Sequence, residues 1–142
     1  MYIRLLSLSV IIAAPHRLRA EKVVQGYSHG SLIASLQPVI PSVKTSHILL
    51  SYPLGPIGWL TLFNKSTYTA NLKELIGNAN SNVLIIYGDH DEFTSIGRYK
   101  AWREQLEGDA RNLKVVEVSG GSHFWRGRSN AEMMCIVREW LP

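Results

Sequence analysis

The sequence is poor in cysteine, in long apolar runs and in concentrated basic charge, and each absence excludes a class of protein. Cys135 is the only cysteine, so no intrachain disulfide can form. Its apolar, helix-like surroundings predict a small buried side chain. The net charge is +4, but lysine and arginine are scattered apart from small groups at residues 17–22 and 126–128. Because a nucleic-acid-binding surface needs a contiguous basic patch, we expect no nucleic-acid partner.

The longest apolar run, residues 5–14, is too short for an ordinary membrane-spanning helix. It has the length of the apolar region of a signal peptide. Pro15 and the basic residues 16–19 that come next are unlike a cleavage region, which favours a strand or helix of the domain instead. We therefore expect a cytoplasmic protein without a membrane partner, the alternative being a secreted one if residues 1–14 act as a signal peptide.

At 142 residues and 46% hydrophobic composition, the chain has the size of one globular domain. We divide it into an apolar segment of uncertain role, residues 1–21, and a domain formed by residues 22–142. No internal repeat or low-complexity segment interrupts the domain.

Apolar runs alternate with helix-like segments along this domain. Short runs rich in β-branched residues predict strands, and three- to four-residue apolar spacing predicts amphipathic helices. The expected strands are about 23–27, 47–51, 83–87 and 113–118, and the expected helices are 31–37, 71–76, 96–106 and 129–140. This order predicts an α/β fold of three layers, with a mostly parallel sheet between helices.

The first strand runs into Gly26-Tyr27-Ser28-His29-Gly30. A serine flanked by glycines between a strand and a helix is typical of a nucleophile elbow, a strained turn that presents a serine hydroxyl. The pentapeptide alone is a weak signal because an ordinary turn has the same composition. Its interpretation therefore depends on the residues at the ends of the later strands.

An acidic group and a histidine come after the third and fourth predicted strands. Asp89 and Asp91 come after residues 83–87, and His123 comes after residues 113–118. Because the carboxyl ends of parallel strands meet at one edge of a sheet, we expect these side chains to gather around Ser28. A histidine can take the serine proton near neutral pH, and a carboxylate can orient that histidine.

The order serine, acid, histidine and their motifs resemble those of α/β-hydrolases, in particular small esterase-like members. The resemblance covers roughly residues 22–142 and rests on the elbow at Ser28, on G-x-x-D ending at Asp91 and on G-x-x-H ending at His123. It implies a serine hydrolase that forms an acyl-enzyme with a small acyl substrate and needs neither metal nor organic cofactor. Asp89 is the second choice for the acid, better suited to turn hydrogen bonds. The backbone N–H of His29 is the expected first oxyanion donor.

The family pattern also requires several strands before the elbow, and the loop after the third strand supplies a second oxyanion donor. Residues 1–21 carry no such motif. The alternative function is therefore a catalytically silent hydrolase-like fragment or interaction module. A sheet with so few strands also predicts self-association through an exposed edge.

Two further groups of side chains have the chemistry of binding residues. Tyr27, Trp59, Phe63 and Trp125 are candidates for an apolar substrate pocket, although each aromatic ring can equally belong to the core. Asp89, His90 and Asp91 include two acids and a histidine, but adjacent acids with one histidine make a poor ligand set, so we expect no metal site.

Overall fold

The computed structural model describes residues 21–56, 64–108, 110 and 112–141, together with the backbone of residues 9–13. The strands are β1 (Ser9–Ala13), β2 (Glu21–Tyr27), β3 (Lys44–Leu50), β4 (Ser81–His90) and β5 (Leu113–Ser122). The helices are α1 (His29–Ser35), α3 (Lys65–Gly77), α4 (Ile96–Glu107) and α5 (Gly127–Trp140).

The strands form one sheet in the order β1-β2-β3-β4-β5. Strands β2 to β5 pair in parallel, which confirms the predicted α/β class with its mostly parallel sheet. The sequence predicted four strands, whereas β1 adds a fifth, antiparallel to β2, from within the apolar amino-terminal segment. The register sets Tyr27 beside Leu50 and Leu50 beside Ile86, so the carboxyl ends of β2, β3 and β4 lie close together.

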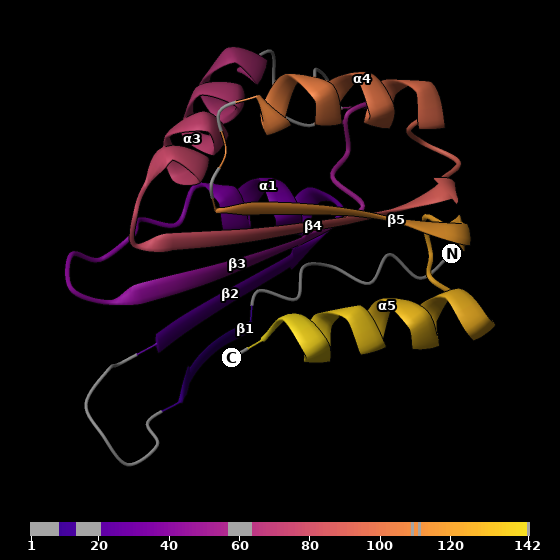
Figure 1. Cartoon of the computed structure of the whole chain (residues 1–142). Coiled ribbons are helices and arrows are strands. Elements are labelled where there is room, and N and C mark those ends of the chain that lie inside the picture. Colours follow the sequence, from indigo (N-terminus) through magenta and orange to yellow (C-terminus); the bar gives the residue numbers. More distant parts are fainter. Residues whose placement is uncertain (1–8, 14–20, 57–63, 109, 111, 142) are drawn as a thin grey trace.

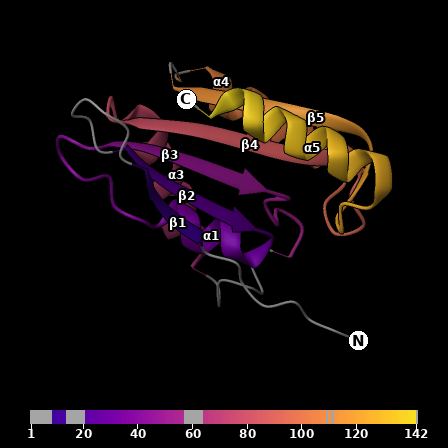
Figure 2. The same cartoon turned by 90° about the horizontal axis from the view of Figure 1, so that it is seen from below.

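Among the described elements, helices α1, α3 and α4 lie on one face of the sheet and α5 lies on the other (Figure 1). Right-handed crossovers that advance across the sheet in one direction bring their helices to one face, which explains why α1, α3 and α4 lie together. Helix α5 comes after the last strand and packs on the opposite face, mainly against β5 and β4 (Figure 2).

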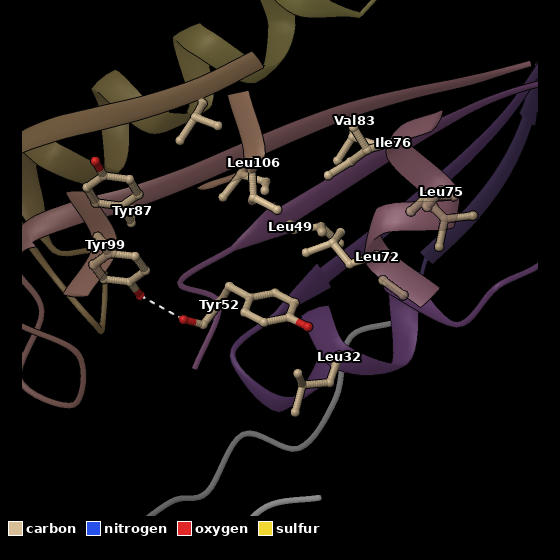
Figure 3. Packing of buried hydrophobic residues seen from close by; sticks show 14 residues of the cluster. Leu32, Leu49, Tyr52, Leu72, Leu75, Ile76, Val83, Tyr87, Tyr99 and Leu106 are labelled. Atoms are coloured by element: carbon tan, nitrogen blue, oxygen red, sulfur yellow. Dashed lines mark hydrogen bonds between the residues drawn. The ribbon is translucent and has the colours of Figure 1, made fainter. Parts of the chain in front are cut away.

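The core has two parts because side chains alternate between the faces of each strand. On the face of α1, α3 and α4, Leu49, Val83 and Ile85 pack with residues of those helices, and the rings of Tyr87 and Tyr99 stack at 4.2 Å (Figure 3). On the face of α5, Ile48 and Leu84 pack against Met133 and Val137. Strand β4 is buried on both faces, as its unbroken apolar run predicts.

The helices differ from the sequence prediction mainly at one end. The predicted apolar faces of α4 and α5 are confirmed, since their apolar residues belong to the two core clusters. Helix α3 begins at Lys65, before the predicted residue 71. The prediction missed its first turns because they are mostly exposed and carry no apolar pattern. No helix among the described residues is long and apolar enough to cross a membrane.

The burial predicted for Cys135 is wrong. This residue lies on the exposed side of α5, away from the buried Met133 and Val137. Its thiol donates a hydrogen bond to Glu139 Oε1 at 3.3 Å. One helical turn separates the two residues, so this contact stays within α5.

Candidate active site

Ser28 occupies a sharp turn between β2 and α1. Its backbone angles, φ 52° and ψ −122°, are costly for a residue with a side chain. The close crossing of β2 and α1 requires Gly26, since a Cβ there would overlap the Gly30 carbonyl. The Ser28 N–H donates to the Leu50 carbonyl at 2.9 Å, so the end of β3 holds the turn in place.

A second pair of glycines brings the ends of β4 and β5 together. A Cβ on Gly88 would overlap the carbonyl of Gly121, so the two strands approach closely where their loops begin. Asp91 directly follows β4, and His123 directly follows β5. Both side chains therefore start from backbones that are in contact.

The structure brings Ser28, His123 and Asp91 into one chain of hydrogen bonds. His123 Nε2 lies 2.9 Å from Ser28 Oγ, and His123 Nδ1 lies 2.8 Å from Asp91 Oδ2. The His123 and Asp91 side chains are buried, whereas Ser28 is partly exposed. This arrangement can move a proton from the hydroxyl to the imidazole while the carboxylate holds the ring.

The Asp91 carboxylate is fixed and kept ionised by its surroundings. Burial opposes ionisation, but hydrogen bonds from the His123 ring and from the Phe93 and Thr94 N–H groups hold the pKa of Asp91 below its usual value of 3.8. The two backbone N–H groups donate to Oδ1 at 2.9 and 3.0 Å, leaving Oδ2 to face the imidazole. The carboxylate therefore meets His123 in one orientation.

Tyr99 approaches the same carboxylate from the core. Its hydroxyl lies 3.0 Å from the Tyr52 carbonyl (Figure 3) and 3.3 Å from Asp91 Oδ2, so it can donate its hydrogen bond to either oxygen. Burial and the charge of Asp91 raise the pKa of Tyr99 far above its usual range. The phenol consequently stays a donor toward the carboxylate.

Asp89, the second choice for the acid, has other partners. Its Oδ1 accepts a hydrogen bond from the Gly120 N–H at 2.7 Å and lies 2.9 Å from His90 Nδ1. It thus joins β4 to β5 near the carboxyl ends of both strands, rather than closing a turn. Within the described ranges, no three His, Cys, Asp or Glu side chains form a metal-binding group.

A carboxylate that sequence reasoning missed holds the histidine loop. Glu92 Oε2 accepts a hydrogen bond from the His123 backbone N–H at 2.8 Å. The Asp89–Gly120 hydrogen bond joins β4 to β5, and the Glu92–His123 hydrogen bond joins the loops that follow these two strands. Their common spacing of 31 residues is visible in the sequence, but nothing local marks it as a contact.

The rings of Phe93 and Phe124 were also missed. They lie 4.7 and 5.6 Å from the His123 ring, centroid to centroid, and both contacts are edge-on. Each comes shortly after a predicted site residue, Phe93 two positions after Asp91 and Phe124 one position after His123. Their closeness in sequence to Asp91 and His123 was the signal that could have identified them as residues near the site.

The predicted pocket residues have different positions. Tyr27 donates to the His123 carbonyl at 2.9 Å, and its ring lies 5.5 Å from the imidazole. Trp125 is buried on the α5 face, where its Nε1 donates to Ser51 Oγ at 2.9 Å. Trp59 and Phe63 lie outside the described residues.

His29, whose backbone N–H was predicted as an oxyanion donor, is the first residue of α1 and is partly buried. Its N–H belongs to the first helical turn, where the amide groups have no carbonyl partner within the helix. This N–H also directly follows Ser28 in the chain. It is therefore the amide of α1 nearest to the serine along the chain.

The chain matches no protein-family model and no curated protein, but its structure resembles solved serine hydrolases and esterases. An α/β serine hydrolase homologue from Coxiella burnetii is 24% identical, with a TM-score of 0.56, and the match covers 84% of this chain and 49% of that one. Esterase 2 of Thermogutta terrifontis, phosphoramylated by tabun, is 16% identical, with a TM-score of 0.60, and the match covers 84% of this chain and 53% of that one. The esterase domain of a Rhodothermus marinus protein is 14% identical, with a TM-score of 0.60, and the match covers 83% of this chain and 59% of that one.

The matches cover most of this chain, and it spans about half the length of the solved structures that it resembles. At these identities the likeness concerns the fold. The chain has a partial α/β-hydrolase fold.

Proposed function

We propose that this chain is a serine hydrolase that cleaves small carboxylic esters through an acyl-enzyme. Ser28 is the nucleophile, His123 the general base and then general acid, and Asp91 the residue that orients the imidazole. The observation that carries the proposal is the continuous hydrogen-bond chain from Ser28 Oγ through both ring nitrogens of His123 to Asp91 Oδ2. Structural likeness to esterases supports the same class of reaction.

In the first half of the reaction, Ser28 Oγ attacks the ester carbonyl carbon. As the new C–O bond forms, the hydroxyl proton moves to His123 Nε2, and Asp91 stabilises the resulting imidazolium. The tetrahedral intermediate then collapses, its bond to the alcohol oxygen breaks, and Nε2 returns the proton to that oxygen. The products of this half are an alcohol and an acyl group esterified to Ser28.

In the second half, water replaces the alcohol. His123 Nε2 takes a proton from the water as its oxygen attacks the acyl carbon, and the same proton then goes to Ser28 Oγ as the acyl bond breaks. A carboxylic acid leaves and the serine is regenerated. All proton transfers use the imidazole, and no step requires a metal or an organic cofactor.

The negative charge on the carbonyl oxygen needs a donor in both halves. The backbone N–H of His29 adjoins the nucleophile and is the donor we propose. Loss of one of two oxyanion donors lowers the rate by on the order of a hundred- to a thousandfold, so a chain with a single donor would be a slow hydrolase that still has an activated serine. A test should therefore detect the serine itself before turnover.

Labelling with a fluorophosphonate probe tests the proposal directly, because the probe reacts with activated serines and requires no turnover. We expect modification of the peptide that contains Ser28, none in Ser28→Ala, and strongly reduced modification in His123→Ala. A circular-dichroism spectrum and a thermal melt of each variant show whether it is folded.

Absence of labelling in well-folded protein would contradict the proposal. The alternative is then favoured, namely a catalytically silent hydrolase-like module. The observation behind this alternative is that the chain spans about half the length of its structural relatives. Labelling at a serine other than Ser28 would also contradict the assignment.

A further inference from the structure

Two half-exposed phenylalanines flank the proposed general base on the surface of the molecule. Phe93 and Phe124 each have 51% of their surface exposed, whereas His123 between them is buried. The other large apolar side chains exposed in the described part are aliphatic or methionine and lie elsewhere. Exposed aromatic rings in contact are costly in water, and such a pair beside a reactive group indicates a binding surface.

The two rings come from different loops and meet each other as well as the histidine. Phe93 belongs to the loop between β4 and α4, and Phe124 to the loop between β5 and α5. Their centroids are 6.0 Å apart in an edge-on arrangement. The Arg126 guanidinium lies over the Phe124 ring at 5.6 Å, a cation–π contact that restrains this ring. The two rings and the imidazole therefore form one cluster of aromatic contacts.

The chemistry of the proposed reaction determines which part of a substrate meets these rings. When the tetrahedral intermediate collapses, His123 Nε2 must lie within hydrogen-bond distance of the departing alcohol oxygen. The alcohol group is consequently next to the imidazole, while the acyl group stays bonded to Ser28. With centroids 4.7 and 5.6 Å from the imidazole, Phe93 and Phe124 border the ring that the alcohol group must approach.

We infer that Phe93 and Phe124 form the leaving-group subsite of this hydrolase and select esters of apolar, ring-bearing alcohols. This inference rests on the proposed function and adds a substrate class to it. Aromatic groups pack favourably edge-on against other rings, which favours benzyl-type alcohols over short alkyl ones.

Two isomeric esters test the inference. Benzyl acetate carries its phenyl ring on the alcohol side, and methyl phenylacetate carries the same ring on the acyl side. In both, the departing oxygen belongs to a weakly acidic alcohol and must be protonated by His123 as it leaves, so both depend on His123 in the same way. We expect Phe93→Ala and Phe124→Ala to lower kcat/KM for benzyl acetate on the order of tenfold, and for methyl phenylacetate no more than about threefold.

The subsite also predicts which kinetic step changes. Benzyl acetate and ethyl acetate give the same acetyl-enzyme, from which the alcohol has already departed. The two substitutions should therefore slow acylation by benzyl acetate, measured as the pre-steady-state burst of benzyl alcohol, and leave deacylation of the acetyl-enzyme close to its original rate. Ile40→Ala is the matched control, since Ile40 is also an exposed apolar residue but precedes the amino end of β3.

Three outcomes are distinguishable. A larger loss for benzyl acetate than for its isomer supports the inference. An equal loss for both isomers, or a larger one for methyl phenylacetate, overturns it while leaving the serine hydrolase intact. If the unmodified chain neither reacts with the fluorophosphonate nor cleaves any of the esters, the proposed function fails, and the leaving-group subsite fails with it.

Discussion

The two aspartates at the end of β4 are only two positions apart but have different partners. Asp91 faces the imidazole through Oδ2, whereas Asp89 accepts hydrogen bonds from the Gly120 backbone and the Ser119 hydroxyl. Substitution by asparagine keeps the size of each side chain and removes its charge. Asp91→Asn and Asp89→Asn are therefore a matched pair that tests which carboxylate orients His123.

We expect Asp91→Asn to lower the rate of fluorophosphonate labelling at Ser28 on the order of a thousandfold, because an amide NH₂ facing Nδ1 favours the wrong tautomer of the ring. The Asn Oδ1 can still accept from the Phe93 and Thr94 N–H groups, so the loop should keep its conformation, which a circular-dichroism spectrum checks. Asp89→Asn should reduce labelling less than tenfold. The opposite order of effects would assign the acid to Asp89.

His47 is a buried histidine on β3 outside the proposed active site. Burial lowers the pKa of His47 to about 4, and the Gln37 carbonyl, which favours protonation, makes no well-formed hydrogen bond with either ring nitrogen. In the unfolded chain the same ring has a pKa near 6.5. Below that pH the ring binds a proton in the unfolded chain but not in the folded one. The contribution of His47 to the unfolding free energy is therefore fully present above about pH 6.5 and is lost as the pH falls toward 4.

Urea unfolding at pH 7.5, 5.5 and 4.5 measures this effect. The pKa of His47 is about 6.5 in the unfolded chain and about 4 in the folded one. This difference corresponds to a loss of roughly 3 kcal/mol in unfolding free energy as the pH falls between these two values. His47→Leu removes the titrating group and should flatten the curve, whereas His90→Asn, at an exposed histidine, should keep the slope. Parallel curves for the unmodified chain and His47→Leu would refute the assignment.

Motif spacing was sufficient to predict the three residues that the structure joins, because Ser28, Asp91 and His123 each directly follow a recognisable strand. Residues that act through a neighbour distant in sequence were not predictable in this way. Glu92 meets His123 only because two strands approach at Gly88 and Gly121. No local pattern in either loop reveals that contact.

At the scale of elements, close approaches of backbone decide whether the site can form. Gly26→Ala would insert a Cβ into the Gly30 carbonyl where β2 meets α1, and neither backbone segment can move without displacing Ser28. We expect a loss of about 3 kcal/mol in unfolding free energy or more, together with loss of labelling at Ser28. Chemical denaturation measures the first effect and the fluorophosphonate probe the second.

Gly97→Ala is the control for this substitution. Gly97 lies in α4, and a Cβ there has no heavy atom within 4 Å. The change should raise the unfolding free energy by about 0.5–1 kcal/mol, because alanine loses less conformational entropy than glycine in a helix. If both alanines had the same effect, crowding at Gly26 would not be the cause.

Elements were predictable where burial leaves a pattern in the sequence. Strand β4 and the apolar faces of α4 and α5 were found for that reason. The first turns of α3 were missed, because residues 65–70 are mostly exposed and polar. For the apolar segment that contains β1, the sequence left three interpretations open: a strand, a helix or a signal peptide. A short apolar run does not reveal its antiparallel pairing with β2.

Over the whole molecule, the described strands differ in whether they pair with a neighbouring strand on one side or on both. Among the described strands, β2, β3 and β4 have a neighbour on each side, whereas β1 and β5 are the outer strands. The self-association predicted through an edge stays a prediction. Its signature would be slower hydrogen exchange in β1 or β5 at higher protein concentration, with the central strands unchanged.

Native-state hydrogen exchange should also reveal how stability is distributed. We expect the amides of residues 48–50 and 83–87, which lie in the buried centre of the sheet, to exchange only through global unfolding. The first turns of α3, residues 65–70, should exchange orders of magnitude faster because they contribute little to the core. Equal protection of both regions would mean that α3 unfolds only with the sheet, contrary to the exposure of its first half.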